Sequence, residues 1–314
     1  MKKGLLVLFL FSVLVLASTS TSAANCGGNI SCNCGDTVVE DYVLDRDLFC
    51  ESTYWPPTSI GLMVGSEGIN IDCNGHSITS DNNEPNFNIA NYAIHTLNKD
   101  NITIKNCHFH YFFCGIYANS KNNFIHNNEF NDSALGIWTT GPNNTIRNNE
   151  MHHNYRAIWI NGNGNLISNN NIYNNYQGIS FYSISPPGPF TNNTFWINRF
   201  VNNDIVVDED NTIGNHWNNS NVGNFWDDFD DNIGYPDYYL VPGNAGSVDY
   251  HPIWFCKEGI EPEVCSEQTP FCCRYGELVA DCQQCGCPSD RPKCQENGHC
   301  TKADKPTLPF IIAN

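Results

Sequence analysis

The sequence predicts an all-β protein: a right-handed parallel β-helix solenoid with about 21 residues per coil, followed by a small disulfide-rich C-terminal domain. The first observation behind this prediction is an internal repeat. Four successive units of 21 residues place the same residue types at matching positions, among them Ile104, Ile125, Ile146 and Ile167, and Asn106, Asn127, Asn148 and Asn169. Such a period indicates one supersecondary unit stacked many times, and it is too short for a two-helix repeat.

The second observation is the pattern inside each unit. Short alternating runs such as Ile158-Trp159-Ile160 are typical of strands, and the Asn and Gly clusters between them are typical of turns. Parallel strands stacked in this way climb about 4.8 Å per coil, and parallel crossovers are nearly always right-handed. We therefore expect Ile146, Met151 and Ile158 to point inward. Asn148 and Asn149 belong at a turn, where amides of consecutive coils bond along the axis, so the Asn columns are interpreted as structural.

The third observation is the cysteine content. Sixteen cysteines fall into two clusters, seven from Cys26 to Cys114 and nine from Cys256 to Cys300. In an exported chain they predict disulfides, and a tail with so little apolar content is held by bridges rather than by a core. The odd number in the tail leaves either a free thiol or a bridge to the body. The Cys282-x2-Cys285-x-Cys287 spacing also occurs in zinc sites, but export favours bridges.

The N-terminus predicts export. Lys2 and Lys3 precede an apolar run from Leu5 to Leu16, and small residues follow at a cleavage site, as in a secretory signal peptide; a buried N-terminal helix is the alternative. No other segment is apolar enough to span a membrane. We predict a secreted, cell-surface or periplasmic protein, and several N-x-S/T sequons are compatible with that location: Asn29, Asn101, Asn131, Asn143, Asn192 and Asn218.

The net charge restricts the partners. The formal charge of the whole chain is −18, and loss of the two signal-peptide lysines makes it −20. A chain with this negative charge repels nucleic acid and anionic membrane surfaces. Neutral glycans, cations and basic partners are compatible with it. The oligomeric state is left open.

These features divide the chain into six segments. Two insertions, near residues 80–91 and around the SISPPGPF sequence, are expected to leave the coil on one side, as binding rims of solenoids often do. The expected segments are a signal peptide (1–24), an N-terminal cap (25–57), β-helix coils (58–217), a closing segment (218–254), a Cys-rich module (255–304) and a loose C-terminus (305–314).

Three stretches carry a family resemblance. CGDTVVEDYVLDRDLFC, GINIDCNGHSI and ITIKNCHFHYFFCGIY resemble secreted parallel β-helix proteins of the NosD or CASH (carbohydrate-binding and sugar hydrolase) type. The segment from Asn224 to Pro252 resembles the closing segment of the periplasmic copper-binding NosD family, although it departs from the usual Asp-x-Asp-Gly-Asn-Gly spacing. The resemblance implies the fold and a Cys34–Cys50 bridge. It leaves function open among lyases, epimerases, hydrolases, binding proteins and accessory factors, and no lyase or epimerase motif can be carried over.

The first candidate site is an aromatic column. Tyr117, Trp138 and Trp159 each follow an inward Ile, so alternation places them outside, one ring per coil. Exposed Tyr and Trp rings can lie against the apolar face of a sugar, which predicts a substrate-binding surface for glycans. The alternative is that the rings cover one another, or lie under a loop or under the Cys-rich tail.

The second candidate site is a carboxylate pair. Glu129 and Glu150 occupy the same position in adjacent coils, with His126, Arg147, Asp132 and His153 nearby in the repeat. Carboxylates about 5 Å apart are what a retaining glycosidase uses, so the pair is a catalytic candidate, against the alternative of a solvated face. The six histidines from residue 95 to residue 153 show no metal-ligand spacing, which disfavours a copper site.

The third candidate site is an acidic loop with Asp227, Asp228, Asp230, Asp231 and Asp237. Oxygen-rich loops hold Ca²⁺, so Asp228, Asp230 and Asp237 are candidate metal ligands, and a hydrated end-cap is the alternative. No other cofactor is expected.

Together these features favour a carbohydrate-binding surface protein. The alternatives are a polysaccharide lyase, epimerase or glycoside hydrolase, and a NosD-like periplasmic accessory or structural protein. Whether the chain is an enzyme is left open, with binding favoured.

Overall fold

The computed structural model describes residues 23–51, 60–81, 91–181, 189–210, 212–253, 265–266, 270–274 and 277–301. Most of the expected signal peptide, Cys256, most of the two expected insertions and the expected loose C-terminus lie outside these ranges. No helix in the described part of the chain is long and apolar enough to cross a membrane.

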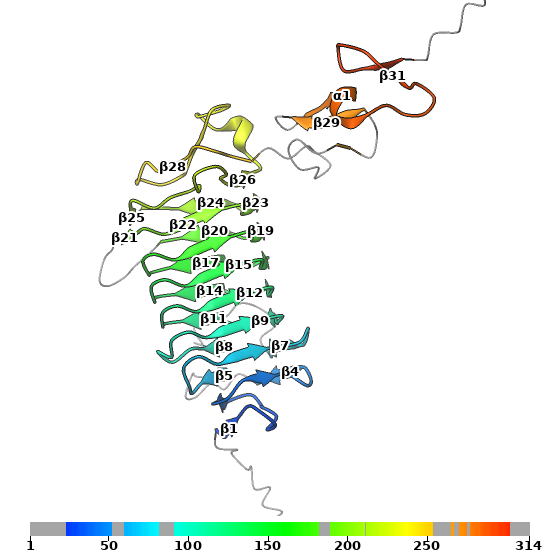
Figure 1. Cartoon of the computed structure of the whole chain (residues 1–314). Helices are drawn as coiled ribbons and strands as arrows, with labels where there is room; N and C mark the ends of the chain where they lie inside the picture. Colours follow the sequence, from blue (N-terminus) through cyan, green and yellow to red (C-terminus); the bar gives the residue numbers. More distant parts are fainter. Residues whose placement is uncertain are drawn as a thin grey trace, which may run out of the picture.

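Three all-parallel sheets form the walls of a β-helix, as predicted (Figure 1). From residue 36 to residue 201, each coil adds one strand to sheet A, then one to sheet B, then one to sheet C. Sheet A contains β1 (Asn25–Cys26), β2 (Asp36–Val38), β5 (Ile60–Val64), β8 (Tyr92–His95), β11 (Cys114–Ala118), β14 (Leu135–Thr139), β17 (Arg156–Ile160), β20 (Gln177–Ser180) and β24 (Ile205–Asp208).

Sheet B contains β3 (Tyr42–Val43), β6 (Asn70–Asp72), β9 (Thr103–Lys105), β12 (Phe124–His126), β15 (Thr145–Arg147), β18 (Leu166–Ser168) and β22 (Thr194–Trp196). Sheet C contains β4 (Leu48–Cys50), β7 (Ser77–Ser80), β10 (His108–His110), β13 (Glu129–Asn131), β16 (Glu150–His152), β19 (Asn171–Tyr173), β23 (Arg199–Val201) and β26 (Phe225–Trp226).

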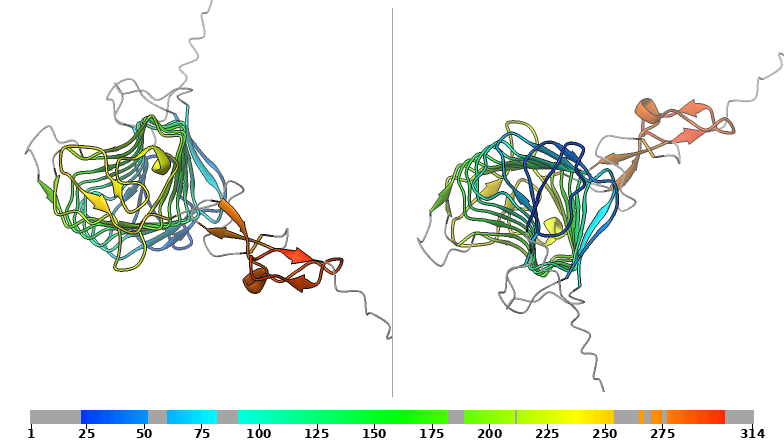
Figure 2. Two further views of the ribbon diagram at one scale, coloured as in Figure 1. Left: turned by 90° about the horizontal axis from the view of Figure 1, so that it is seen from above. Right: turned by 90° about the horizontal axis from the view of Figure 1, so that it is seen from below.

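The coils superpose when viewed along the axis of the β-helix (Figure 2). Columns of buried apolar side chains fill the interior. In sheet A, Ile116, Ile137, Ile158 and Ile179 pair in register, and all four side chains are fully buried. The inward assignment of Ile146, Met151 and Ile158 is confirmed, because each is fully buried. Burial of these apolar side chains stabilises the stacking of one coil on the next.

Buried asparagines form ladders along the corners. At the corner between sheets B and C, Asn128, Asn149 and Asn170 each donate through Nδ2 to the Asn Oδ1 one coil further on, and the series continues through Asn198 to Asn224. A second ladder between sheets A and B ends when Asn215 Nδ2 donates to Glu209. The structural interpretation of the Asn columns is confirmed. At the turns, these side-chain amides supply the hydrogen bonds that backbone pairing supplies within the strands.

Short elements close the far end. β21 (Phe190–Thr191) pairs with β25 (Thr212–Ile213), a 3₁₀ turn η1 covers Phe229–Asp231, and β27 (Tyr239–Leu240) pairs antiparallel with β28 (Val248–Asp249). Trp226 stacks on Tyr239 of this segment with ring centroids 4.1 Å apart, and both rings are buried.

The C-terminal module is small and cross-linked. It contains β29 (Phe271–Arg274), β30 (Glu277–Ala280), α1 (Cys282–Cys285), β31 (Lys293–Cys294) and β32 (Cys300–Thr301). Among the described residues, its bridges include Cys265–Cys285, Cys282–Cys294 and Cys287–Cys300.

The disulfides of the β-helix lie toward its N-terminal end. They are Cys26–Cys32, Cys34–Cys50 and Cys73–Cys107, so the Cys34–Cys50 prediction is confirmed. Cys114 is a buried free thiol, and burial raises its pKa.

Candidate functional site

The outer face of sheet C carries two polar columns. His108, Glu129, Glu150 and Asn171 pair in register along the first column, so Glu129 and Glu150 are direct neighbours on adjacent strands. The second column, two residues further along each strand, holds His110, Asn131, His152 and Tyr173. Side chains alternate between the two faces of a strand, which is why both columns face outward while Phe130 and Met151 between them are buried.

Glu129 joins the two columns. Its Oε2 lies 2.7 Å from His108 Nδ1, and its Oε1 lies 3.2 Å from His152 Nε2 on the next strand. His152 Nδ1 lies in turn 3.0 Å from Nδ1 of His153. We call this continuous chain of His108, Glu129, His152 and His153 the imidazole–carboxylate row.

The row is partly shielded from solvent. The side chain of His152 is 14% exposed and that of Glu129 is 29% exposed. Burial by itself would raise the pKa of Glu129, but the hydrogen bonds from His108 and His152 outweigh burial and hold the pKa below its usual value. Glu129 is therefore an anion at neutral pH, and it is set up to accept protons or cations rather than to donate a proton.

Glu150 has a different environment. It is exposed, and it accepts a hydrogen bond of 2.7 Å from the hydroxyl of Tyr173. Burial and this acceptor raise the pKa of Tyr173 to about 12, so the phenol stays protonated and keeps donating. The predicted pair is thus brought together, but Glu129 lacks the raised pKa that a glycosidase general acid needs.

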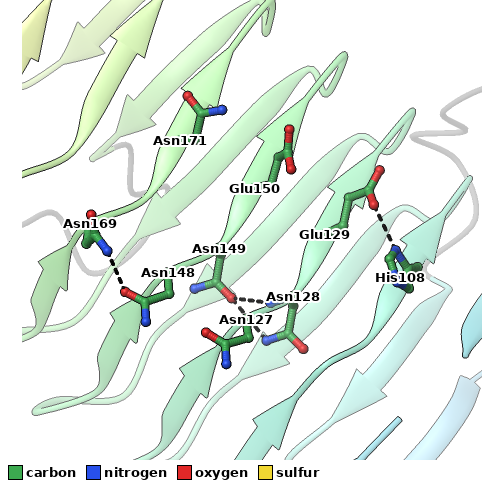
Figure 3. Close-up of a pocket in the computed structure, with 9 residues that line it drawn as sticks. All are labelled: His108, Asn127, Asn128, Glu129, Asn148, Asn149, Glu150, Asn169 and Asn171. Atoms are coloured by element: carbon green, nitrogen blue, oxygen red, sulfur yellow. Dashed lines mark hydrogen bonds and ion pairs between the residues drawn. The ribbon is translucent and has the colours of Figure 1, made fainter. Parts of the chain in front are cut away.

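A cleft of about 360 Å³ adjoins the row at the corner between sheets B and C (Figure 3). Figure 3 shows Glu129, Glu150 and Asn171 projecting from successive strands beside it. Exposed Asn127, Asn148 and Asn169 form its other side from left-handed turn positions. The lining is amide, imidazole and carboxylate, a set suited to cations and hydroxyl groups.

The aromatic column lies on the outer face of sheet A. Tyr117 stacks on Trp138 with centroids 4.4 Å apart, and Trp138 stacks on Trp159 at 4.7 Å with only 9° between the ring planes. The guanidinium of Arg156 lies 5.3 Å from the centroid of Trp159. The rings therefore occupy one another's faces and turn their edges outward. Trp138 Nε1 is buried without a hydrogen-bond partner in the described part of the chain.

The acidic loop does not bring three carboxylates together with oxygens within 4.8 Å of one another. Asp228 accepts hydrogen bonds from the Tyr239 hydroxyl at 3.0 and 3.2 Å, and desolvation of its carboxyl group raises its pKa. Asp228, Asp230 and Asp237 are all exposed residues. Within the described ranges, the only three His, Cys, Asp or Glu side chains whose ligand atoms all lie within 4.8 Å of one another are Cys282, Cys287 and Cys294. All three are in disulfides, so their sulfurs are not available as metal ligands.

Sequence reasoning missed the role of His152. The 21-residue step places Glu129 beside Glu150, but the Glu129–His152 contact is diagonal, between residues 23 apart. The signal was nevertheless present: His152 follows the inward Met151, so alternation places it on the same outer face as Glu129.

More than half of the chain matches a known protein family. Residues 57–231, which are 175 of the 314 residues, match the model of a family described as periplasmic copper-binding protein (NosD). No curated protein and no solved structure matched the chain. Since the match covers more than half of the chain and falls on the three parallel sheets, the chain belongs to the NosD family.

Proposed function

We propose that this protein is an extracytoplasmic accessory protein that binds a copper ion through the imidazole–carboxylate row. The observation that carries the proposal is the contact of one ionised carboxylate, Glu129, with two imidazoles, His108 and His152. The description of the matched family supports copper as the metal, and the disulfides of both domains support a location outside the cytoplasm.

The donor chemistry fits. Imidazole suits Cu²⁺, and carboxylate oxygens complete nitrogen–oxygen ligand sets for this ion. Neighbouring donor atoms of the row are 2.7, 3.2 and 3.0 Å apart. Ligands bound to one metal ion at about 2.0–2.1 Å have similar separations, so a metal can take the place of a shared proton between two of them. Three ligands on one ion require a rotation of at least one side chain.

The test is a Cu²⁺ titration of the full-length oxidised protein by calorimetry, with electron paramagnetic resonance to identify nitrogen ligands. We expect one bound ion per chain with imidazole nitrogen coordination. The His152→Asn and Glu129→Gln variants should each weaken the affinity at least tenfold, because each removes a donor at the centre of the row.

His126→Asn is the matched control. His126 lies on β12 in sheet B, where its ring stacks on Phe124 at 4.2 Å, away from the row. Its loss should leave copper affinity unchanged. Absence of binding by the parent protein, or equal weakening by the His126 and His152 variants, would overturn the proposal.

A second candidate function is glycan binding by the aromatic column. The observation that favours it is a row of partly exposed rings, Tyr117, Trp138 and Trp159, on the outer face of sheet A. Because the ring faces are stacked on one another, a sugar chain would meet the ring edges.

A further inference from the structure

The corner between sheets A and B has an alternating pattern. Its turn positions are Asn101, Asn122, Asn143, Gly164 and Asn192, all with positive φ. Two residues later, in strand register, stand Thr103, Phe124, Thr145, Leu166 and Thr194. Every second coil therefore carries an Asn-x-Thr sequon, and the coils between carry an apolar residue instead of Thr.

The three sequon asparagines are accessible. Asn101, Asn143 and Asn192 are exposed, with φ of 61°, 58° and 57°, so the left-handed turn presents each amide at the edge of the molecule. The matching threonines are half-buried on the outer face of sheet B. Beside Asn143, the next turn residue is Gly164, and a Cβ there would lie only 2.6 Å from Asn143 Oδ1. The absence of a side chain at Gly164 avoids this close contact with the Asn143 side chain.

Asn131 differs from these three although its sequon is equally good in sequence. Its side chain contacts His110 Nδ1 and donates to Glu129 Oε1 at 3.3 Å. The third residue of its sequon, Ser133, is fully buried, donates to the Asn131 carbonyl and accepts a hydrogen bond from the Phe112 N–H. Neither the amide nor the hydroxyl is free for a modifying enzyme.

We propose that the exported chain carries N-linked glycans on Asn101, Asn143 and Asn192. The amide Nδ2 of each Asn forms a bond to the anomeric carbon of an oligosaccharide carried on a lipid diphosphate. The bond from that carbon to the phosphate oxygen breaks, the lipid diphosphate leaves, and the amide loses one proton. The hydroxyl at the third position of the sequon is what the transferring enzyme reads.

The geometry of the corner suits such a stripe. Two coils separate successive sequons, which is about 9.5 Å along the axis, enough for separate sugar chains. Leu166, which is 40% exposed, lies on the strand between those of Asn143 and Asn192 and offers apolar surface to the first sugars. Glycans at this corner leave the outer face of sheet C, with the imidazole–carboxylate row, uncovered.

The test is secretion of the full chain from a host that adds glycans to N-x-S/T sequons, followed by glycopeptide mass spectrometry. A flexible sequon-bearing tag at the C-terminus reports that the host modified the preparation. We expect sugar on Asn101, Asn143 and Asn192, and an unmodified Asn131 in the folded protein. Thr145→Val keeps a β-branched residue but removes the hydroxyl, so it should abolish sugar on Asn143 alone.

The matched gain-of-site variant is Phe124→Thr, which completes a sequon at Asn122 and should add a fourth glycan. The proposal is overturned if any of the three predicted asparagines is bare while the tag is modified. It is also overturned if Asn131 carries sugar in folded protein.

Discussion

The side-chain amide of Asn128 donates a hydrogen bond to Asn149 Oδ1 at 3.0 Å, and the Asn128 backbone N–H donates to the same oxygen at 3.0 Å. This unit repeats up the corner until Asn224 meets the buried carboxylate of Asp249, which also accepts from Trp226 Nε1. A turn without such amides would leave backbone groups unpaired in the interior of the corner.

Asn149→Ala should therefore be strongly destabilising. Asn149 also donates to the Ile125 carbonyl and to Asn170 Oδ1, each at 3.0 Å, so its loss leaves several buried polar groups without hydrogen bonds. Each buried polar group without a hydrogen bond costs about 1–3 kcal/mol. We therefore expect a loss of about 3–5 kcal/mol in the free energy of unfolding, measured by urea titration.

Its neighbour Asn148 is the control. Asn148 is exposed with φ of 54°, so Asn148→Ala should cost only about 1 kcal/mol, the strain of a left-handed Ala. Equal losses for the two variants would contradict the assignment of the ladder to the buried residue.

Ile137→Ala tests the interior. Ile137 is fully buried between Ile116 and Ile158, and a large-to-small change at such a site costs about 2–5 kcal/mol. Leu166→Ala, at a side chain that is 40% exposed, should cost less than about 0.5 kcal/mol. Thermal and urea unfolding measure both variants. A larger loss of stability for Leu166→Ala than for Ile137→Ala would contradict the assignment of Ile137 to the interior.

Ile197→Asn should stabilise the protein. Ile197 has φ of 56° at the corner position where other coils have Asn, and its side chain is 41% exposed. A β-branched residue is strained in this region, and Asn is not. We expect a gain of about 1 kcal/mol in the free energy of unfolding. A loss would mean that packing of the Ile197 side chain outweighs the backbone strain.

Asp249 should give the protein a measurable pH dependence. Burial raises its pKa in the folded state, although the N–H groups of Asn224, Trp226 and His251 oppose this shift. The folded state then holds the proton more tightly than the unfolded chain does. The Asp249 contribution to stability should rise as pH falls through the folded pKa, and be complete below the ordinary aspartate value near 3.9.

The comparison variant is Asp249→Asn. As the pH falls from 7 toward 4, the melting temperature of the parent protein should rise relative to that of the Asp249→Asn variant. A constant difference across this range would show that Asp249 does not titrate differently in the folded and unfolded states.

Trp138→Ala tests the second candidate function. If polysaccharide binds the aromatic column, removing its central ring should weaken binding by about 1–3 kcal/mol, measured by affinity electrophoresis or a glycan array. Glu150→Gln, on the outer face of sheet C, should leave this binding unchanged. Loss of binding in the Glu150 variant with retention in Trp138→Ala would move the glycan site to the carboxylates.

Much of the fold was predictable because a solenoid converts long-range contacts into a fixed sequence step. Ile116, Ile137 and Ile158 are in contact across strands, yet their spacing alone predicts the contact. The same step predicted that Glu129 and Glu150 are neighbours, and alternation predicted which side chains face outward. The Cys34–Cys50 bridge followed from family resemblance rather than from the repeat.

By itself, then, the sequence determined the coil, its register and its inner and outer faces, since these depend on a period and on the pleat of a strand. The tertiary structure decided what the outer side chains do with one another. Rotation about side-chain bonds turns His152 diagonally toward Glu129 and lays Trp138 flat on Trp159, and no residue spacing encodes such a rotation. For that reason the pattern predicted the positions of the Glu129–Glu150 column and of the aromatic column. Only the folded chain showed that the Glu129 carboxylate lies between two imidazoles and that the faces of the aromatic rings cover one another.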